Sequence, residues 1–208
     1  MDYDRLDSIY MVSCSAASLA IGIYPLTLML FHIKRVVKYR YLSLVCLILI
    51  SDIAFCLGGI CGGQKRGTPG CVFQYVTTNY FPVYSCLLSM IVMRELYYTI
   101  CLGKIFPVKD YTMFHIIAAL IPLICTFVPL STVDIGPTTV NFKGYGDDQD
   151  DGVNGYGWCY IIPRDNGTPG WLYSFWVLAG FYAWIWISVV YMVGLCILLY
   201  FHINVQTV

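Results

Sequence analysis

Five long apolar runs divide the sequence, and each is long enough to cross a lipid bilayer, which takes about 20 helical residues. The runs lie at about 8–33, 41–62, 72–102, 111–132 and 171–203. Lipid offers no hydrogen-bond partners, so each spanning segment must satisfy its own backbone groups, as a helix does. Only 12% of the 208 residues are charged and 59% are hydrophobic, a balance that suits lipid. We therefore predict an all-α fold: a polytopic transmembrane bundle of five helices, with residues 1–208 as one domain.

Basic residues around the first run predict the orientation of the bundle. One basic residue, Arg5, precedes this run, whereas four basic residues follow it within 34–40. Basic residues that flank the first helix tend to remain in the cytoplasm, so we place the N-terminus outside. Three of the first seven residues are aspartates, and the first run is too long for a signal peptide, so we expect it to stay as a helix. The connection at 133–170 is then a long outer loop.

This outer loop holds a glycosylation sequon, Asn166-Gly167-Thr168, and its position outside makes Asn166 the predicted site of a glycan. The loop also holds an aspartate run at 147–151 that partly imitates a calcium-binding loop. The twelfth position of such a loop, normally an acidic ligand, is Trp158. We therefore expect a solvated acidic loop and predict no metal site.

Two of the ten cysteines differ in context from the rest, which lie in or beside apolar runs. Cys71 opens the third run, and Cys159 lies in the outer loop, within Trp158-Cys159-Tyr160. Both positions face the oxidising side of the membrane, where a disulfide persists. We predict a Cys71–Cys159 bond that links the loop to the third helix. The alternative is a pair of free thiols.

Three residues of the Asp, Glu, Lys and Arg types lie inside the predicted spanning helices. Asp52 is near the middle of the second run, and Arg94 and Glu95 are near the inner end of the third. Ionisable residues are costly in lipid and mark functional sites by default. We therefore predict a role in conformational coupling for Asp52. The alternatives are a hydrogen-bonded structural carboxylate at Asp52, and headgroup contacts for Arg94 and Glu95.

Taken together, these features resemble the seven-helix G-protein-coupled receptors. The resemblance rests on the Cys at the outer end of the third helix, the Trp-Cys of the outer loop, and Glu95-Leu96-Tyr97, which begins 24 residues after Cys71. The loop is similar to that of the cyclic-AMP-receptor-like group, with some likeness to the secretin and adhesion groups. The resemblance covers the first five helices of that fold and implies coupling roles for Arg94, Glu95 and Tyr97.

The resemblance also implies two binding surfaces. The second inner loop would face a heterotrimeric G protein through Lys104, Ile105 and Phe106. An extracellular ligand would bind near the outer ends of the third and fifth helices, at Gln74, Thr78, Phe81 and Trp176. The alternatives are an ordinary turn at the membrane interface for the first set, and packing or lipid contacts for the second.

The sequence thus predicts a multi-pass plasma-membrane receptor that senses an extracellular ligand and relays a helix rearrangement to a cytoplasmic G protein. One alternative is a structural or assembly subunit of a multi-chain membrane complex, in which another chain supplies further helices. Another is a transporter or channel subunit with Asp52 on the ion path. We expect no enzymatic activity and no cofactor, because no nucleophile motif or phosphate-binding loop occurs. The net charge of zero gives no indication of nucleic-acid binding.

Overall fold

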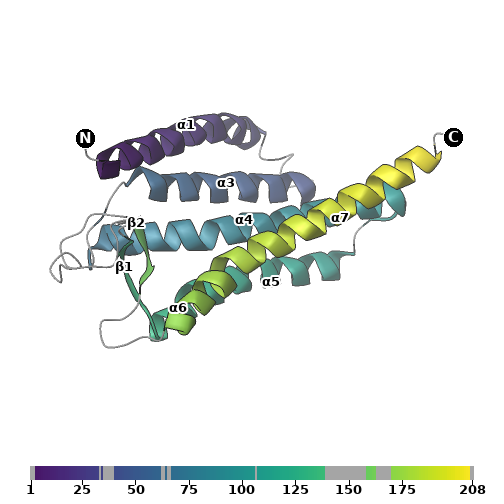
Figure 1. Cartoon of the computed structure of the whole chain (residues 1–208). Helices are drawn as coiled ribbons and strands as arrows, with labels where there is room; N and C mark the ends of the chain where they lie inside the picture. Colours follow the sequence, from purple (N-terminus) through teal and green to yellow (C-terminus); the bar gives the residue numbers. More distant parts are fainter. Residues whose placement is uncertain are drawn as a thin grey trace.

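The described part of the chain contains five helices long and apolar enough to cross a membrane, as the sequence predicts (Figure 1). The structure, a computed structural model, describes residues 3–32, 34, 40–61, 64, 67–105, 107–138, 158–162 and 170–206. Its helices are α1 (Tyr3–Phe31), α3 (Arg40–Ile60), α4 (Pro69–Cys101), α5 (Val108–Phe127), α6 (Gly170–Val177) and α7 (Ala183–Gln206). A π-helical segment, Leu178–Tyr182, joins α6 and α7 into one span. The all-α prediction is confirmed, and the five spans fit a multi-pass membrane protein.

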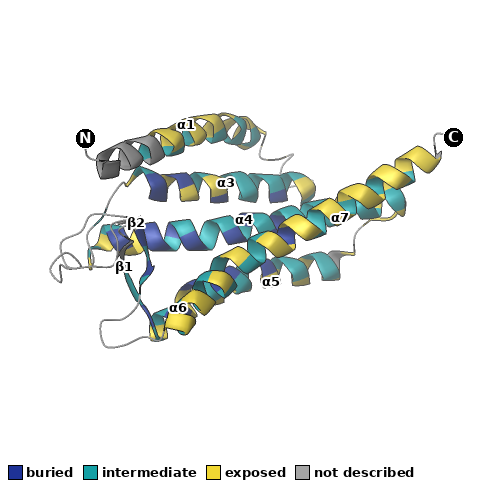
Figure 2. Cartoon of the chain, viewed as in Figure 1, coloured by how far each residue is buried: buried dark blue, intermediate teal, exposed yellow. Residues whose placement is uncertain are grey.

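Helix α4 is the centre of the bundle. It packs against α3, α5 and α7, whereas α1 packs against α3. The main apolar cluster joins Leu44 of α3, Val83 and Leu88 of α4, and Ala118 of α5. Figure 2 shows the buried residues concentrated along α4 and the exposed ones along α1 and α7. Since lipid is an apolar solvent, exposed apolar side chains on these outer helices suit a bilayer.

The first turn of α4 shows why the helix begins three residues before the predicted run. Thr68 is the N-cap, and its hydroxyl accepts a hydrogen bond from the backbone N–H of Cys71 at 3.2 Å. Pro69 occupies the first helical turn, where its missing N–H and fixed φ cost nothing. The cap therefore sets the helix start, and it also places Cys71 on the buried side of the first turn.

A strand pair lies over one end of the bundle, in the region predicted only as a loop. Strand β1 (Asp134–Thr138) pairs antiparallel with β2 (Trp158–Ile162), with Ile135 opposite Ile161 and Pro137 opposite Cys159. Before β1, the α5 run ends in a 3-10 turn, Val128–Ser131. Strand β2 packs against α4. We call this end of the bundle the hairpin end (Figure 1).

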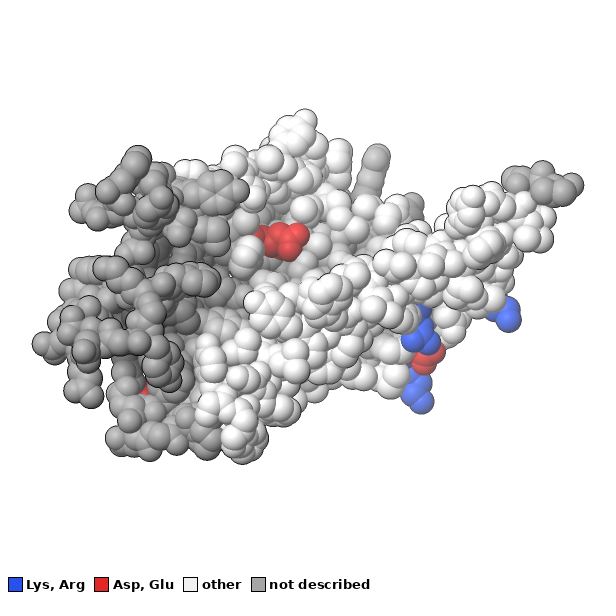
Figure 3. Space-filling model, in the orientation of Figure 1, with Lys and Arg blue, Asp and Glu red and all other residues white. Residues whose placement is uncertain are grey.

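Basic side chains gather at the opposite end of the bundle, near the C-terminus (Figure 3). Arg40 begins α3, Arg94 lies near the end of α4, and Lys104 and Lys109 lie in the turn that follows and at the start of α5. We call this the basic end. The two termini lie at opposite ends of the bundle, as an odd number of spans requires (Figure 1).

Helices α3 and α4 approach most closely where α3 carries Gly58. A Cβ added at this glycine would lie 2.0 Å from the Oγ1 atom of Thr77. That hydroxyl cannot move freely, because it donates to the carbonyl oxygens of Phe73, at 2.8 Å, and Gln74, at 3.0 Å. The contact between the two helices therefore depends on the absence of a side chain at Gly58.

Gly58→Ala is expected to lower the free energy of unfolding by about 1–3 kcal/mol, the usual cost of overpacking a close contact. The matched control is Gly194→Ala in α7, where an added Cβ meets nothing within 4 Å. That change should raise stability by about 0.5–1 kcal/mol, because alanine favours helix over glycine. Thermal unfolding of both variants in the same detergent measures the difference. Equal stability of the two variants would contradict the close approach at Gly58.

Candidate functional site

The predicted disulfide is present and joins the hairpin end to α4. Cys71 and Cys159 are bonded across a sequence separation of 88 residues, and both are buried. The other eight cysteines are free. The bond connects the first turn of α4 to β2, so the outer-loop strand moves with this helix.

A second connection between the same elements comes from Gln74, one turn along α4. Its side-chain oxygen accepts a hydrogen bond from the backbone N–H of Cys159 at 2.9 Å, and its amide nitrogen donates to the carbonyl of Gly58 at 3.3 Å. Gln74 is fully buried. One side chain thus links β2, α4 and α3, and we call this arrangement the Gln74 bridge.

Tyr75 and Asn79, one turn apart on α4, contact the end of α5. The Tyr75 hydroxyl donates to the carbonyl of Thr126 at 2.7 Å, and the Asn79 amide donates to the Thr126 hydroxyl at 3.3 Å. The Oδ1 atom of Asn79 is buried and has no hydrogen-bond partner among the described residues. Tyr75 also packs edge-on against Tyr160 of β2. Burial raises the pKa of Tyr160 above its ordinary value, so its hydroxyl stays neutral at physiological pH.

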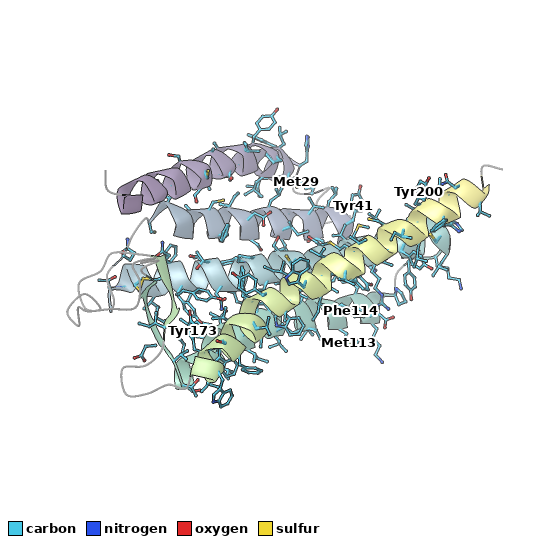
Figure 4. All side chains as sticks on the ribbon, in the orientation of Figure 1. Met29, Tyr41, Met113, Phe114, Tyr173 and Tyr200 are labelled. Atoms are coloured by element: carbon cyan, nitrogen blue, oxygen red, sulfur yellow. A yellow bond between two sulfur atoms is a disulfide. The ribbon has the colours of Figure 1, made fainter. Side chains whose placement is uncertain are left out.

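The residues predicted to bind a ligand fall into two separate groups. Gln74, Thr78 and Phe81 share one side of α4, as positions four and three residues apart do. Trp176 is on another helix, α6, and its indole N–H donates to the Thr132 hydroxyl at 2.9 Å. Its neighbour Tyr173 lies between α6 and the strand pair, within the same apolar cluster as Trp176 (Figure 4). The bridge contacts of Gln74 give this residue a structural role that the sequence did not indicate.

The π-helical segment between α6 and α7 packs on α5 through a cysteine. The thiol of Cys125 accepts a hydrogen bond from the indole N–H of Trp184 at 3.2 Å and lies 3.8 Å from the carbonyl of Ala179. Gly180, in the same segment, is buried beside the backbone of Cys125. Single π turns inside helices often occur at functional sites, and this one lies beside the Tyr75 contacts with Thr126.

Asp52 lies on the exposed side of α3, at mid-length. The hydroxyl of Ser85 in α4 donates to its Oδ1 atom at 2.8 Å. Figure 3 shows a patch of acidic atoms on a face whose other described atoms, as far as the basic end, are uncharged. An aspartate at the centre of a membrane helix costs about 2.5–3.5 kcal/mol on insertion scales. The hydrogen bond from Ser85 offsets part of that cost.

Charged and aromatic side chains from three helices meet at the basic end. The guanidinium of Arg94 lies 4.4 Å from the ring centre of Phe114, which Figure 4 places on α5. The guanidinium of Arg40 lies 5.6 Å from the ring centre of Tyr111 and interacts electrostatically with Glu95. The Oε2 atom of Glu95 is buried and accepts no hydrogen bond from the described residues. We call these five residues the basic-end cluster.

The predicted coupling residues do not form one site. Arg94 and Glu95 belong to the basic-end cluster, and Tyr97 is half-buried close by. Asp52 instead contacts Ser85, which precedes Glu95 by ten residues of α4, or about 15 Å along the helix axis. Asp52 and the basic-end cluster are therefore separate sites, connected through α3, which carries Asp52 and Arg40, and through α4.

The other predicted site residues are placed only in part. Lys104 and Ile105 are exposed beyond the end of α4, where Gly103, with φ of 59°, ends the helix. Phe106 and Asn166 lie outside the described residues. Among the residues that the structure describes, no group of three or more His, Cys, Asp and Glu side chains could hold a metal ion.

The structure adds Arg40, Ser85 and Tyr111 to the residues singled out from the sequence. Arg40 was visible only as one of several basic residues in the first connection. Ser85 and Tyr111 are common residue types in apolar runs, and only the packing of α3, α4 and α5 pairs them with charged partners. No protein-family model matches the chain, and no curated protein matches it.

Proposed function

We propose that this chain is a plasma-membrane signalling receptor of the G-protein-coupled type, with the hairpin end outside the cell and the basic end in the cytoplasm. The observation that carries the proposal is that α4 links two sites. Its first turn holds β2 through Cys71, and its last turns carry Arg94 and Glu95. A ligand that displaces the hairpin would therefore act on the helix that reaches the cytoplasmic cluster.

Signalling in this proposal is a shift between two arrangements of the bundle, driven by a ligand that binds one of them more tightly. In the resting arrangement, Glu95 of α4 interacts with Arg40 of α3. Movement of α4 would separate these charges and change the surface at the basic end. The exposed side chains of Lys104 and Ile105, just beyond α4, are the surface that would meet the G protein.

Glu95→Gln tests this proposal without a known ligand. The change removes the charge that attracts Arg40, so it should favour the signalling arrangement. We expect basal nucleotide exchange to rise about fivefold or more, which is the size of a typical coupling free energy of 1–3 kcal/mol. The measurement uses the purified chain in lipid nanodiscs with purified heterotrimeric G proteins of each major class.

The matched control is Asp110→Asn, which removes a carboxylate from the first turn of α5 at the same end of the bundle. This variant should exchange nucleotide at the wild-type rate. The receptor proposal fails if neither the wild-type chain nor Glu95→Gln raises exchange above that of empty nanodiscs with any G protein. An equal rise in both variants would mean that the basic-end cluster is not the switch.

A further inference from the structure

Asp52 lies too deep in its helix to reach water. It precedes Ile60, the last residue of α3, by eight residues, and follows Arg40, the first, by twelve. At 1.5 Å per residue these separations are about 12 Å and 18 Å. An aspartate side chain is much shorter than either distance, so it cannot extend to the headgroups as lysine and arginine do. With α3 across a bilayer, this carboxylate stays in the hydrocarbon layer.

The carboxylate is also incompletely satisfied. An ionised carboxylate offers about four acceptor positions on its two oxygens. Among the described residues, Ser85 is the one donor to Asp52, and it contacts Oδ1. The thiols of Cys56 and Cys86 lie within electrostatic reach of the same group. The Oδ2 atom therefore remains an acceptor on an exposed helix face.

The surroundings of Asp52 combine exposed apolar side chains with small polar ones. One turn further along α3, Phe55 is exposed, so the carboxylate is bordered by apolar surface. On α4, Thr78 and Ser89 lie on the same side as Ser85, seven residues before it and four after it. Helices α3 and α7 both pack along α4, without extensive contact between them in the described part of the chain. We call the exposed surface of α3 and α4 around Asp52 and Ser85 the Asp52 face.

We propose that the Asp52 face binds an apolar transmembrane helix of a partner protein, and that this helix presents a hydrogen-bond donor at the depth of Asp52. The donor would be an amide, a hydroxyl or an ammonium group, since each can donate to Oδ2. Small polar side chains such as Ser85 and Thr78 let two helices approach closely, which such an interhelical bond requires. The Asp52 face thus offers an acceptor for the donor of such a helix, and its small polar side chains permit a close approach.

Other occupants of the Asp52 face fit less well. Lipid headgroups carry donors, but about 12 Å of hydrocarbon separates them from this depth. A second copy of the chain, related by a two-fold axis through this face, would bring the two Asp52 side chains together. Two ionised carboxylates in a low-dielectric layer repel strongly, so self-association through this face would require that one of the two carboxyl groups be protonated. The proposal does not depend on signalling, because a partner helix would bind whether or not the chain couples to a G protein.

Model peptides test the proposal directly. The full chain, labelled with a fluorescent donor, is placed in phosphatidylcholine vesicles with an acceptor-labelled Leu/Ala peptide of about 23 residues, long enough to span the bilayer. One peptide carries a central Asn, a second carries Leu there and a third carries Asp. Interhelical hydrogen bonds in membranes predict that the Asn peptide associates about 3- to 30-fold more tightly than the Leu peptide. The Asp peptide should associate more tightly at low pH than at high pH, because only a protonated carboxyl group can donate to Oδ2.

Two variants of the chain locate the binding surface. Asp52→Leu should remove the preference for the Asn peptide. The matched control adds Ile50→Asp to that variant, which moves the carboxylate two residues along α3, or about 200° around the helix, at nearly the same depth. This control should not restore the preference. Thermal unfolding in detergent shows whether each variant folds, and the comparison of three peptides on the wild-type chain needs no variant.

Three outcomes would overturn the proposal. The first is equal association of the Asn and Leu peptides with the wild-type chain. The second is a preference for Asn that survives Asp52→Leu or returns with Ile50→Asp, because the site is then not on the Asp52 face. The third is energy transfer between two labelled copies of the chain that Asp52→Leu abolishes, because a second copy is then the occupant.

Discussion

Replacing Cys71 by serine is expected to lower the free energy of unfolding by about 2–4 kcal/mol. In the chain-entropy description, a disulfide that closes a loop of this length stabilises a soluble protein by about 4–5 kcal/mol, because it restricts the unfolded chain. The bond joins residues 88 positions apart. Helices that remain in the membrane during unfolding are already restricted, so the expected effect is below the soluble value. Thermal unfolding in detergent, with and without reductant, measures it.

The controls for this prediction separate the bond from the loss of a thiol. Cys14→Ser removes an exposed free cysteine of α1 and should change stability by no more than about 0.5 kcal/mol. Cys159→Ser should match Cys71→Ser, and the double variant should match each single one, because both break the same bond. A double variant that loses twice the stability of either single variant would show that the two cysteines act independently.

Features that depend on composition over about 20 residues could be predicted from the sequence. The five spans follow from apolar runs, because lipid requires long helices of low charge. Helix ends were less predictable, since a hydrogen bond from Cys71 N–H to the Thr68 side chain, rather than hydropathy, sets the start of α4. Strand β1 was missed because Gly136 and Pro137 favour turns, yet its backbone pairs with β2 in the structure.

The site was predictable where residue chemistry alone was decisive. The Cys71–Cys159 bond followed from the placement of both residues on the oxidising side of the predicted topology. Asp52 was singled out as a charge in an apolar run, but its partner Ser85 is 33 residues away and carries no signal of its own. The two contacts of Gln74 are 16 and 85 residues away. Contacts of this range are set by how α3, α4 and β2 pack, which no local pattern encodes.

Gln74→Leu is expected to lower the free energy of unfolding by about 2–4 kcal/mol. Leucine fills a similar volume but leaves the backbone N–H of Cys159 and the carbonyl of Gly58 without the partner each has now. Each buried polar group left unpaired costs about 1–3 kcal/mol. The matched control is Thr78→Val, one turn along α4. Among the described residues, the Thr78 hydroxyl bonds only to the backbone of its own helix, so its loss should cost about 0.5 kcal/mol or less.

Combining Gln74→Leu with Cys71→Ser tests whether the bridge and the disulfide form one unit. Both hold Cys159 against α4, one through its backbone N–H and one through its sulfur. Once the disulfide is broken, β2 can separate from α4. Water can then satisfy the Cys159 N–H that Gln74→Leu leaves unpaired. The double variant should therefore lose at least about 0.5 kcal/mol less than the sum of the two single losses. Strict additivity would mean that Gln74 stabilises the contact between α3 and α4 and contributes little to holding β2.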